Sequence, residues 1–110
     1  MLGAYELKRA SDGQFVWNLR SANGLTILTS EAYHSMAGAL SGILSCRTHS
    51  PQEERYCRMT ARDGQHYFVL RAANQEPIGS SEMYRSVAAR EVGIESCKRH
   101  GPGAELVDHS

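Results

Sequence analysis

The chain has 110 residues, a length typical of one compact domain with a single core. Its 12 basic and 12 acidic side chains cancel, so it lacks the basic surplus that usually accompanies nucleic-acid binding. It contains no apolar run of about 18 residues or more, so we expect no membrane-spanning helix.

The three cysteines are an odd number without a CxxC pair, which does not suggest a disulfide framework. The N-terminal segment lacks the basic stretch and apolar stretch of a secretory signal. We therefore expect a cytoplasmic protein with reduced thiols and no cofactor.

The chain contains an internal duplication. When it is shifted by 51 residues, residues 12–49 align with residues 63–100 without a gap, and 18 of the 38 pairs are identical. Self-similarity at a fixed period is typical of repeat architectures. We predict a single domain, 1–110, made of repeat one (4–52) and repeat two (53–110).

Three strands are expected at the start of each repeat. In repeat one they cover about residues 4–9, 14–20 and 25–31, and their counterparts follow in repeat two. The first two strands are joined at Asp12-Gly13, a pair that favours a tight turn because Gly tolerates a positive φ and Asp caps its own turn.

The loop after the second strand decides which face Ile27 occupies. A two-residue Asn-Gly turn would place Ile27 on the face opposite Trp17 and Leu19, whereas a three-residue loop with a bulge places all three on one face. We favour the bulged loop because Ile27 is apolar in both copies. In repeat two we expect Asn74 to take the left-handed conformation.

A helix follows the three strands in each repeat. Ser35 and Ser86 stand at the N-cap position, immediately before MAGALSGILSCR and VAAREVGIESCK. Repeat one carries leucines where repeat two carries glutamates, so the first helix has the wider apolar face. The leucine/glutamate pairs are Leu40/Glu91 and Leu44/Glu95.

A last strand, AELVD, closes the chain. A single repeat has a thin core, and joining two sheets buries more apolar surface. We predict an α+β fold in which the tandem units form one continuous antiparallel sheet with both helices packed on one face.

The stretches WNLRSANGLTILTSEAYHSMAGALSGILSC and YFVLRAANQEPIGSSEMYRSVAAREVGIESCKRH resemble the YegP-like family of small bacterial proteins. Its repeat has the pattern L-[KR]-A-A-N-G, then I…SE.Y.S, then A…GI.S. The resemblance implies β3-αβ units that share a sheet and exchange their final strands, and it implies no activity. The chain departs from the pattern at Gln75, which replaces the turn glycine, and at Cys46 and Cys97, where valine is more usual.

Two Cys-x-x-His pairs are the strongest metal-ligand pattern. Cys46 with His49 and Cys97 with His100 together make a Cys2His2 set. Both cysteines also fall on the apolar stripe of a helix, and both histidines fall in its last turn, where an imidazole suits the helix dipole. We favour this second reading and predict no metal site.

Nucleophilic catalysis is not expected. Ser30-Glu31 and Ser81-Glu82 repeat, but no histidine occupies a matching position near both pairs. We therefore predict that the chain is not an enzyme and has no catalytic residues.

Arg20 and Arg71 are the strongest surface signal. Strand alternation places them on the sheet face away from the helices, together with Tyr67. An arginine beside an aromatic group can stack on a base or bind a carboxylate. We favour the simpler interpretation, in which each arginine covers sheet surface and pairs with a glutamate.

These patterns predict a small non-catalytic module that binds a protein or a small ligand. Nucleic-acid binding through the open sheet face is the alternative, and a metal or hydrolytic site is a weaker one. We expect a monomer that is an internal pseudo-dimer, or a weak homodimer formed through Leu40 and Leu44. The candidate binding residues are Arg20, Arg71, Glu31, Glu82 and Tyr67.

Overall fold

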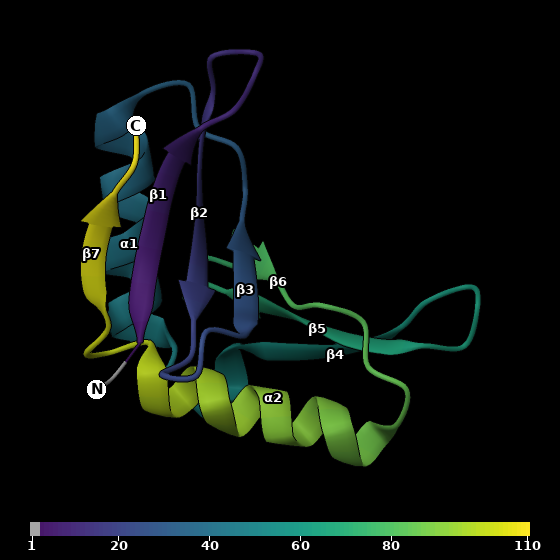
Figure 1. The fold of residues 1–110 in the computed structure, drawn as a ribbon. Coiled ribbons are helices and arrows are strands. Elements are labelled where there is room, and N and C mark those ends of the chain that lie inside the picture. Colours follow the sequence, from purple (N-terminus) through teal and green to yellow (C-terminus); the bar gives the residue numbers. More distant parts are fainter. Residues whose placement is uncertain (1–2) are drawn as a thin grey trace.

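The computed structural model describes residues 3–110, which form one seven-stranded sheet covered on one face by two helices (Figure 1). The strand order is β4-β5-β6-β3-β2-β1-β7. The predicted α+β fold with a sheet shared by the two repeats is therefore confirmed. The elements are β1 (Ala4–Arg9), β2 (Phe15–Arg20), β3 (Thr26–Ser30), α1 (Met36–His49), the 3-10 helix η1 (Glu53–Arg55), β4 (Tyr56–Thr60), β5 (His66–Arg71), β6 (Pro77–Ser80), α2 (Val87–His100) and β7 (Glu105–Asp108).

The prediction of an entirely antiparallel sheet was wrong at one strand. β7 pairs with β1 in parallel, with Ala4 opposite Glu105 and Leu7 opposite Asp108. A tight turn between two strands forces them to be antiparallel, but β7 follows a helix, so no turn sets its direction. This pairing places the last strand of repeat two on the first strand of repeat one, as the family resemblance implied.

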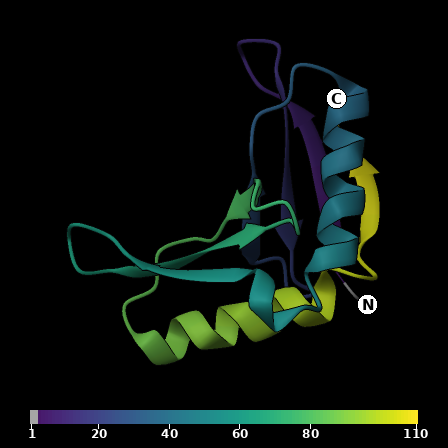
Figure 2. The ribbon, with the colours of Figure 1, turned by 180° about the vertical axis from the view of Figure 1, so that it is seen from behind.

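The sheet is strongly twisted, so β1 and β2 run across the direction of β4 and β5 (Figures 1 and 2). Helix α1 lies along β1 and β2, and α2 lies along β4 and β5. The C-terminal end of α2 lies beneath the β2–β3 loop of the other repeat. Each helix therefore meets the hairpin of the opposite repeat as well as its own strands.

The bulged hairpin loop is confirmed. Leu19 lies opposite Leu28, whereas Arg20 lies opposite Thr26, so Ile27 is the inserted residue of the bulge. Ile27 is buried in the core, which explains why the position is apolar in both repeats.

The expected left-handed residue in repeat two was wrong. Gly24 takes φ 85° in the first hairpin, and its counterpart Gln75, not Asn74, takes φ 74° in the second. The two loops have the same hydrogen bonds, since Gly24 donates to the Ser21 carbonyl and Gln75 to the Ala72 carbonyl. The loop geometry is thus retained, and a residue with a Cβ atom occupies a glycine conformation.

The predicted N-caps are confirmed. The hydroxyl of Ser35 accepts a 3.0 Å bond from the Gly38 amide, and that of Ser86 accepts the same bond from the Ala89 amide. Within residues 3–110, neither helix is long and apolar enough to span a membrane.

The edge strand β4 differs from its counterpart β1 because no strand among residues 3–110 pairs with its outer edge. The segment of repeat one that corresponds to β7, residues 54–57, forms part of η1 and the start of β4 instead of a separate strand. Arg58 takes the position that buried Leu7 has in β1, and its guanidinium binds Glu91 at 2.7 Å and Glu53 at 2.8 Å. Glu91 is the counterpart of Leu40. An ion pair therefore replaces an apolar pair at the open edge, a feature that discourages further strand pairing.

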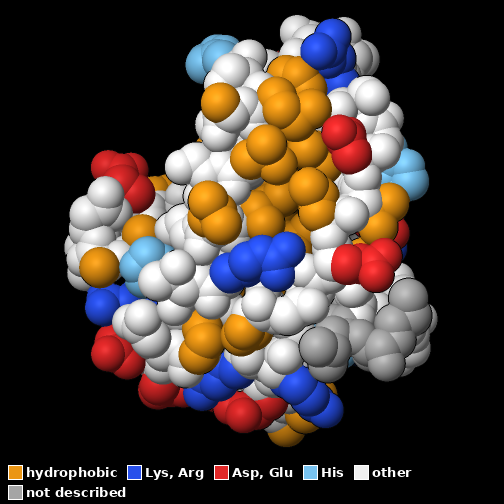
Figure 3. All heavy atoms as spheres, turned by 90° about the vertical axis from the view of Figure 1, so that its left-hand side faces the viewer, with side chains coloured by type: hydrophobic (Ala, Val, Ile, Leu, Met, Phe, Trp, Pro, Cys, Tyr) orange, Lys and Arg blue, Asp and Glu red, His pale blue; other side chains and the backbone are white. Residues whose placement is uncertain are grey.

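Apolar side chains gather on the side of the molecule formed by α1 and β7 (Figure 3). Three exposed leucines belong to these two elements, namely Leu40, Leu44 and Leu106. Leu40 and Leu44 of α1, where α2 has Glu91 and Glu95, thus contribute to this apolar side of the molecule.

Candidate functional site

Two grooves occupy equivalent places in the two repeats. The α1 groove lies between α1 and the β5–β6 loop and has a volume of about 500 Å³. The α2 groove lies between α2 and the β2–β3 loop and has a volume of about 1050 Å³. Every residue that lines the α1 groove has its 51-residue counterpart in the α2 groove. Each groove therefore combines the helix of one repeat with the hairpin of the other.

Six of these lining positions are identical in the two repeats. In the α1 groove they are Glu31, Tyr33, Gly42, Ser45, Asn74 and Ile78. In the α2 groove they are Glu82, Tyr84, Gly93, Ser96, Asn23 and Ile27.

A tyrosine wedged against a helical glycine shapes each groove. The Tyr33 backbone pairs with Phe15 on β2, and its ring packs between the sheet and α1. A Cβ atom on Gly42 would overlap the Tyr33 hydroxyl, and one on Gly93 would overlap the Tyr84 hydroxyl. Both glycines are required because the helix approaches the tyrosine closely.

The serines that precede the glutamates have a folding role. The Ser30 hydroxyl accepts a 2.9 Å bond from the Trp17 amide and donates a 2.7 Å bond to the Glu31 carbonyl. Ser81 makes the same two bonds in repeat two. Each hydroxyl is therefore committed to the backbone where its strand ends, a position that does not suit a nucleophile.

The Glu31 and Glu82 side chains are exposed and make no ion pair within residues 3–110. Burial and then the nearby Glu31 charge raise the pKa of Tyr33. Burial, Cys97 and Glu82 likewise raise the pKa of Tyr84. Each carboxylate thus acts on the tyrosine of its own groove and has no structural partner of opposite charge.

The arginines singled out by the sequence brace their own hairpin loops. Arg20 donates a 3.1 Å bond to the Gly24 carbonyl and pairs with Glu6 at 3.1 Å. Arg71 donates a 3.0 Å bond to the Gln75 carbonyl. These bonds account for the arginine in both repeats and leave fewer guanidinium N–H groups free to bind a ligand.

The five predicted binding residues do not form one site. Glu31 lines the α1 groove, while Glu82 and Arg20 line the α2 groove. Arg71 braces its loop, and half-buried Tyr67 lies opposite Met59 on β4 and lines neither groove. Glu31 and Glu82 therefore lie in two separate grooves beside the helices and not with Tyr67 on the open sheet face.

The two helical thiols are core groups. Cys46 and Cys97 are fully buried, and contact with Cys97 together with burial raises the pKa of Cys46 well above its usual value. Such a thiol stays protonated and packs as a small apolar group. Within the described chain, no three His, Cys, Asp or Glu side chains are arranged to hold a metal ion.

The two histidines connect the repeats. His49 Nε2 accepts a 3.3 Å bond from the Ala73 amide, and His100 Nε2 accepts the same bond from the Ala22 amide. In each case Nδ1 lies within 2.9 Å of a helix carbonyl, that of Ser45 or Ser96, so it carries the proton. Each imidazole thus holds the hairpin loop of the opposite repeat against the end of its helix.

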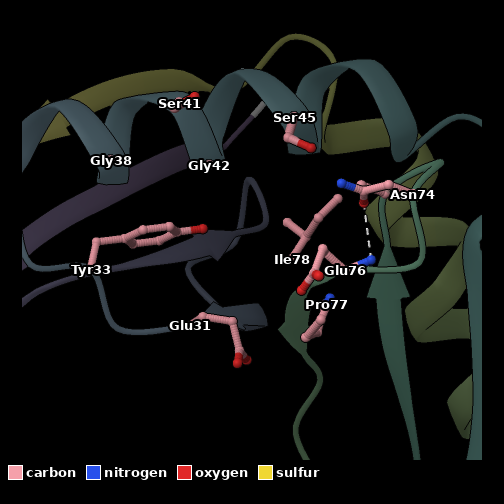
Figure 4. A pocket seen from close by; sticks show the side chains of 11 residues that line it. Glu31, Tyr33, Gly38, Ser41, Gly42, Ser45, Asn74, Glu76, Pro77 and Ile78 are labelled. Atoms are coloured by element: carbon pink, nitrogen blue, oxygen red, sulfur yellow. Dashed lines mark hydrogen bonds between the residues drawn. The ribbon is translucent and has the colours of Figure 1, made fainter.

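Figure 4 shows the α1 groove from close by. Glu31 and Tyr33 come from the segment between β3 and α1, and Asn74, Glu76 and Ile78 come from the opposite hairpin. The Glu76 backbone amide donates a 3.0 Å hydrogen bond to Asn74 Oδ1. This bond holds the backbone that carries the Glu76 carboxylate. Two carboxylates therefore border one opening from opposite sides.

Sequence reasoning identified Glu31 and Glu82 but missed the grooves to which they belong. The duplicated Tyr-Gly and Asn-Ile pairs were visible as identities. They were not recognisable as one surface, because each groove joins residues that are far apart along the chain, Tyr33 and Asn74 in one and Asn23 and Tyr84 in the other.

Comparison with known proteins supports this architecture. The family model of a domain of unknown function, DUF1508, matches residues 10–56 and again residues 61–108. The chain is 50% identical over 110 residues to the UPF0339 protein YegP of Shigella flexneri, covering 100% of both chains. It is 45% identical over 108 residues to a UPF0339 protein of Shewanella oneidensis, covering 98% of each.

Two solution NMR structures have the same fold. The structure of yegP from E. coli, described as a protein of unknown function, matches with a TM-score of 0.94 at 50% identity and covers 99% of this chain and 94% of its own. That of the Shewanella oneidensis protein matches with a TM-score of 0.92 at 45% identity, covering 98% and 92%. The tandem fold is thus common to these relatives.

Proposed function

The chain belongs to the DUF1508 family, and we propose that it is a small non-catalytic binding module that holds its ligand in the α1 and α2 grooves. The observation that carries the proposal is the identity of six lining pairs, including the exposed carboxylates of Glu31 and Glu82. The tyrosines and glycines have a folding role. The carboxylates have none within the described residues, and exposed polar groups without a structural role are candidates for binding.

A segment of another protein suits these grooves best. The α2 groove is open and carries two strongly exposed apolar side chains, Leu25 and Val92. Apolar walls with a few polar groups are typical of binding sites. Two related grooves on one rigid domain would also allow a ligand to bind at two points, which raises its overall affinity.

A random-peptide display selection on the immobilised protein tests the proposal. Enriched peptides are then titrated into ¹⁵N-labelled protein, and we expect shifts at groove amides such as those of Gly42 and Gly93. Shifts confined to the open sheet face, or no enrichment at all, would contradict it.

A matched pair of variants checks the location. Val92→Gln removes an exposed apolar side chain from the α2 groove, and Leu44→Gln removes one that lines neither groove. Both lie on helix surfaces, so both should fold. We expect Val92→Gln to weaken the selected peptides and Leu44→Gln to leave them unchanged. Equal weakening by both variants would contradict binding in the grooves and would indicate that the peptides bind the apolar side of α1.

We also propose a cytoplasmic location and a monomeric state. The free thiols Cys46, Cys57 and Cys97 are consistent with a reducing compartment. Sedimentation of Leu44→Gln beside the unchanged chain tests the monomer, since a dimer formed through this leucine would dissociate in the variant.

A further inference from the structure

We propose that the α1 groove binds a basic side chain, arginine in preference to lysine, of a protein ligand, between the carboxylates of Glu31 and Glu76. The inference rests on the proposed function and names the chemistry that one of the two grooves recognises.

The charges of the groove support a cationic ligand. Glu31 and Glu76 are the only charged side chains among its lining residues, and both are exposed and unpaired within residues 3–110. Both charges have the same sign, so both attract a cation that enters the groove. The groove is therefore complementary to a positive group.

The groove walls support a side chain with an apolar stem. Tyr33, Pro77 and Ile78 line the same opening as the carboxylates (Figure 4). A guanidinium group is planar and can bind carboxylates through two donors while it packs on an aromatic ring, and its methylene stem covers apolar surface. Apart from Glu31 and Glu76, the lining residues include no carboxylate that could bind a metal ion.

The α2 groove provides the contrast. Its counterpart of Glu76 is Leu25, and Arg20 and Arg99 line it beside Glu82. Arg20 is already paired with Glu6, but Arg99 lies in the groove with Glu82 and no second carboxylate lines it, so the groove has no net attraction for a basic side chain. The preference is therefore expected in the α1 groove only.

The experiment uses N-acetyl-arginine amide as the probe and N-acetyl-citrulline amide as its neutral isostere, titrated into the ¹⁵N-labelled full chain. We expect the arginine derivative to shift the amides of Gly38, Gly42 and Asn74, and to bind at least about tenfold more tightly than the citrulline derivative. Binding should weaken as the salt concentration rises.

Three variants locate the effect. Glu31→Gln and Glu76→Gln should each weaken binding about tenfold. Glu54→Gln, which removes an exposed carboxylate that lines neither the α1 nor the α2 groove, should leave it unchanged. All three positions are exposed, so an unchanged spectrum elsewhere confirms the fold. Equal binding of arginine and citrulline, equal effects of all three variants, or displacement of the probe by millimolar magnesium chloride at constant ionic strength would each overturn the inference.

The failure of this inference is distinguishable from failure of the proposed function. If neither derivative binds while selected peptides still shift groove amides, the binding module stands and the preference for arginine is wrong. If selected peptides shift no groove amide, the proposed function itself fails.

Discussion

The hydroxyl of Tyr5 donates a 2.6 Å hydrogen bond to the carbonyl of Gly101, so the first strand of the chain holds the end of its last helix. The counterpart Tyr56 donates a bond of the same length to Ser50, at the end of the first helix. The Tyr5 ring also packs edge-on against Trp17, with centroids 5.3 Å apart. The two repeats are thereby joined through one buried core.

Tyr5→Phe tests this connection. The substitution keeps the ring but leaves the buried Gly101 carbonyl without a donor, and we expect a loss of about 1–3 kcal/mol in the free energy of unfolding. Urea unfolding followed by circular dichroism measures it. Tyr67→Phe is the control, because Tyr67 is half-buried on the open sheet face, and it should change stability little. Equal effects would show that the hydroxyl bond contributes nothing specific.

Gly42→Ala should destabilise the chain by about 1–3 kcal/mol, because the new methyl group overlaps the Tyr33 hydroxyl. Gly38→Ala is the matched control on the same helix. Its Cβ atom would lie 3.2 Å from Ser35 Oγ, and repeat two already has Ala89 there, so stability should stay equal or rise. Thermal unfolding compares the two, and a destabilised Gly38→Ala with a neutral Gly42→Ala would contradict the close approach.

Gln75→Gly should stabilise the chain by up to about 1 kcal/mol. Gln75 occupies φ 74°, where a side chain is strained and glycine is not. The reverse change in repeat one, Gly24→Gln, introduces the same strain at φ 85° and should destabilise. Chemical denaturation of both variants measures the difference. A destabilised Gln75→Gly would mean that the glutamine makes contacts worth more than its strain.

Stability should fall at acid pH partly through Glu91. Its pKa is lowered by Arg58 and Arg90, so it stabilises the fold above its unfolded pKa of about 4.3, and this contribution is lost as the pH falls through the lower folded value. The pair is partly exposed, so the contribution is at most about 1 kcal/mol. Glu91→Gln should therefore lose stability at pH 7 and differ little from the unchanged chain at pH 3.

Glu54→Gln serves as the control for this pH dependence, because Glu54 is exposed and has no ion pair within the described chain. Urea midpoints at the two pH values give the comparison. An identical pH dependence in Glu91→Gln and Glu54→Gln would mean that the Arg58–Glu91 pair makes no net contribution.

Local chemistry made much of the fold predictable from the sequence. Ser35 caps its helix through an amide only three residues away, and Asp12 accepts from the Gln14 amide in the turn that the Asp-Gly pair indicated. The bulge was predictable because a shift of one residue would have exposed Ile27. The left-handed residue was not, since glutamine disfavours that conformation and only the shared loop geometry imposes it on Gln75.

The candidate site was only partly predictable. Glu31 and Glu82 stood out as identities without a folding role, but Arg20 and Arg71 stood out equally, and only their bonds to loop carbonyls explain them. A strand pattern shows which face a side chain occupies. The same pattern does not show whether that side chain already donates a hydrogen bond to a nearby backbone carbonyl.

The sequence by itself determined the duplication, both α-helices and their N-caps, the approximate positions of the strands and the bulged hairpin loop, because these depend on spacings of a few positions and on a period that repeats. Only the tertiary structure decided that β7 runs parallel to β1, that His100 supports the loop at Ala22, and that two carboxylates border the α1 groove. Those relationships join distant segments, and their geometry arises when both repeats pack into one core.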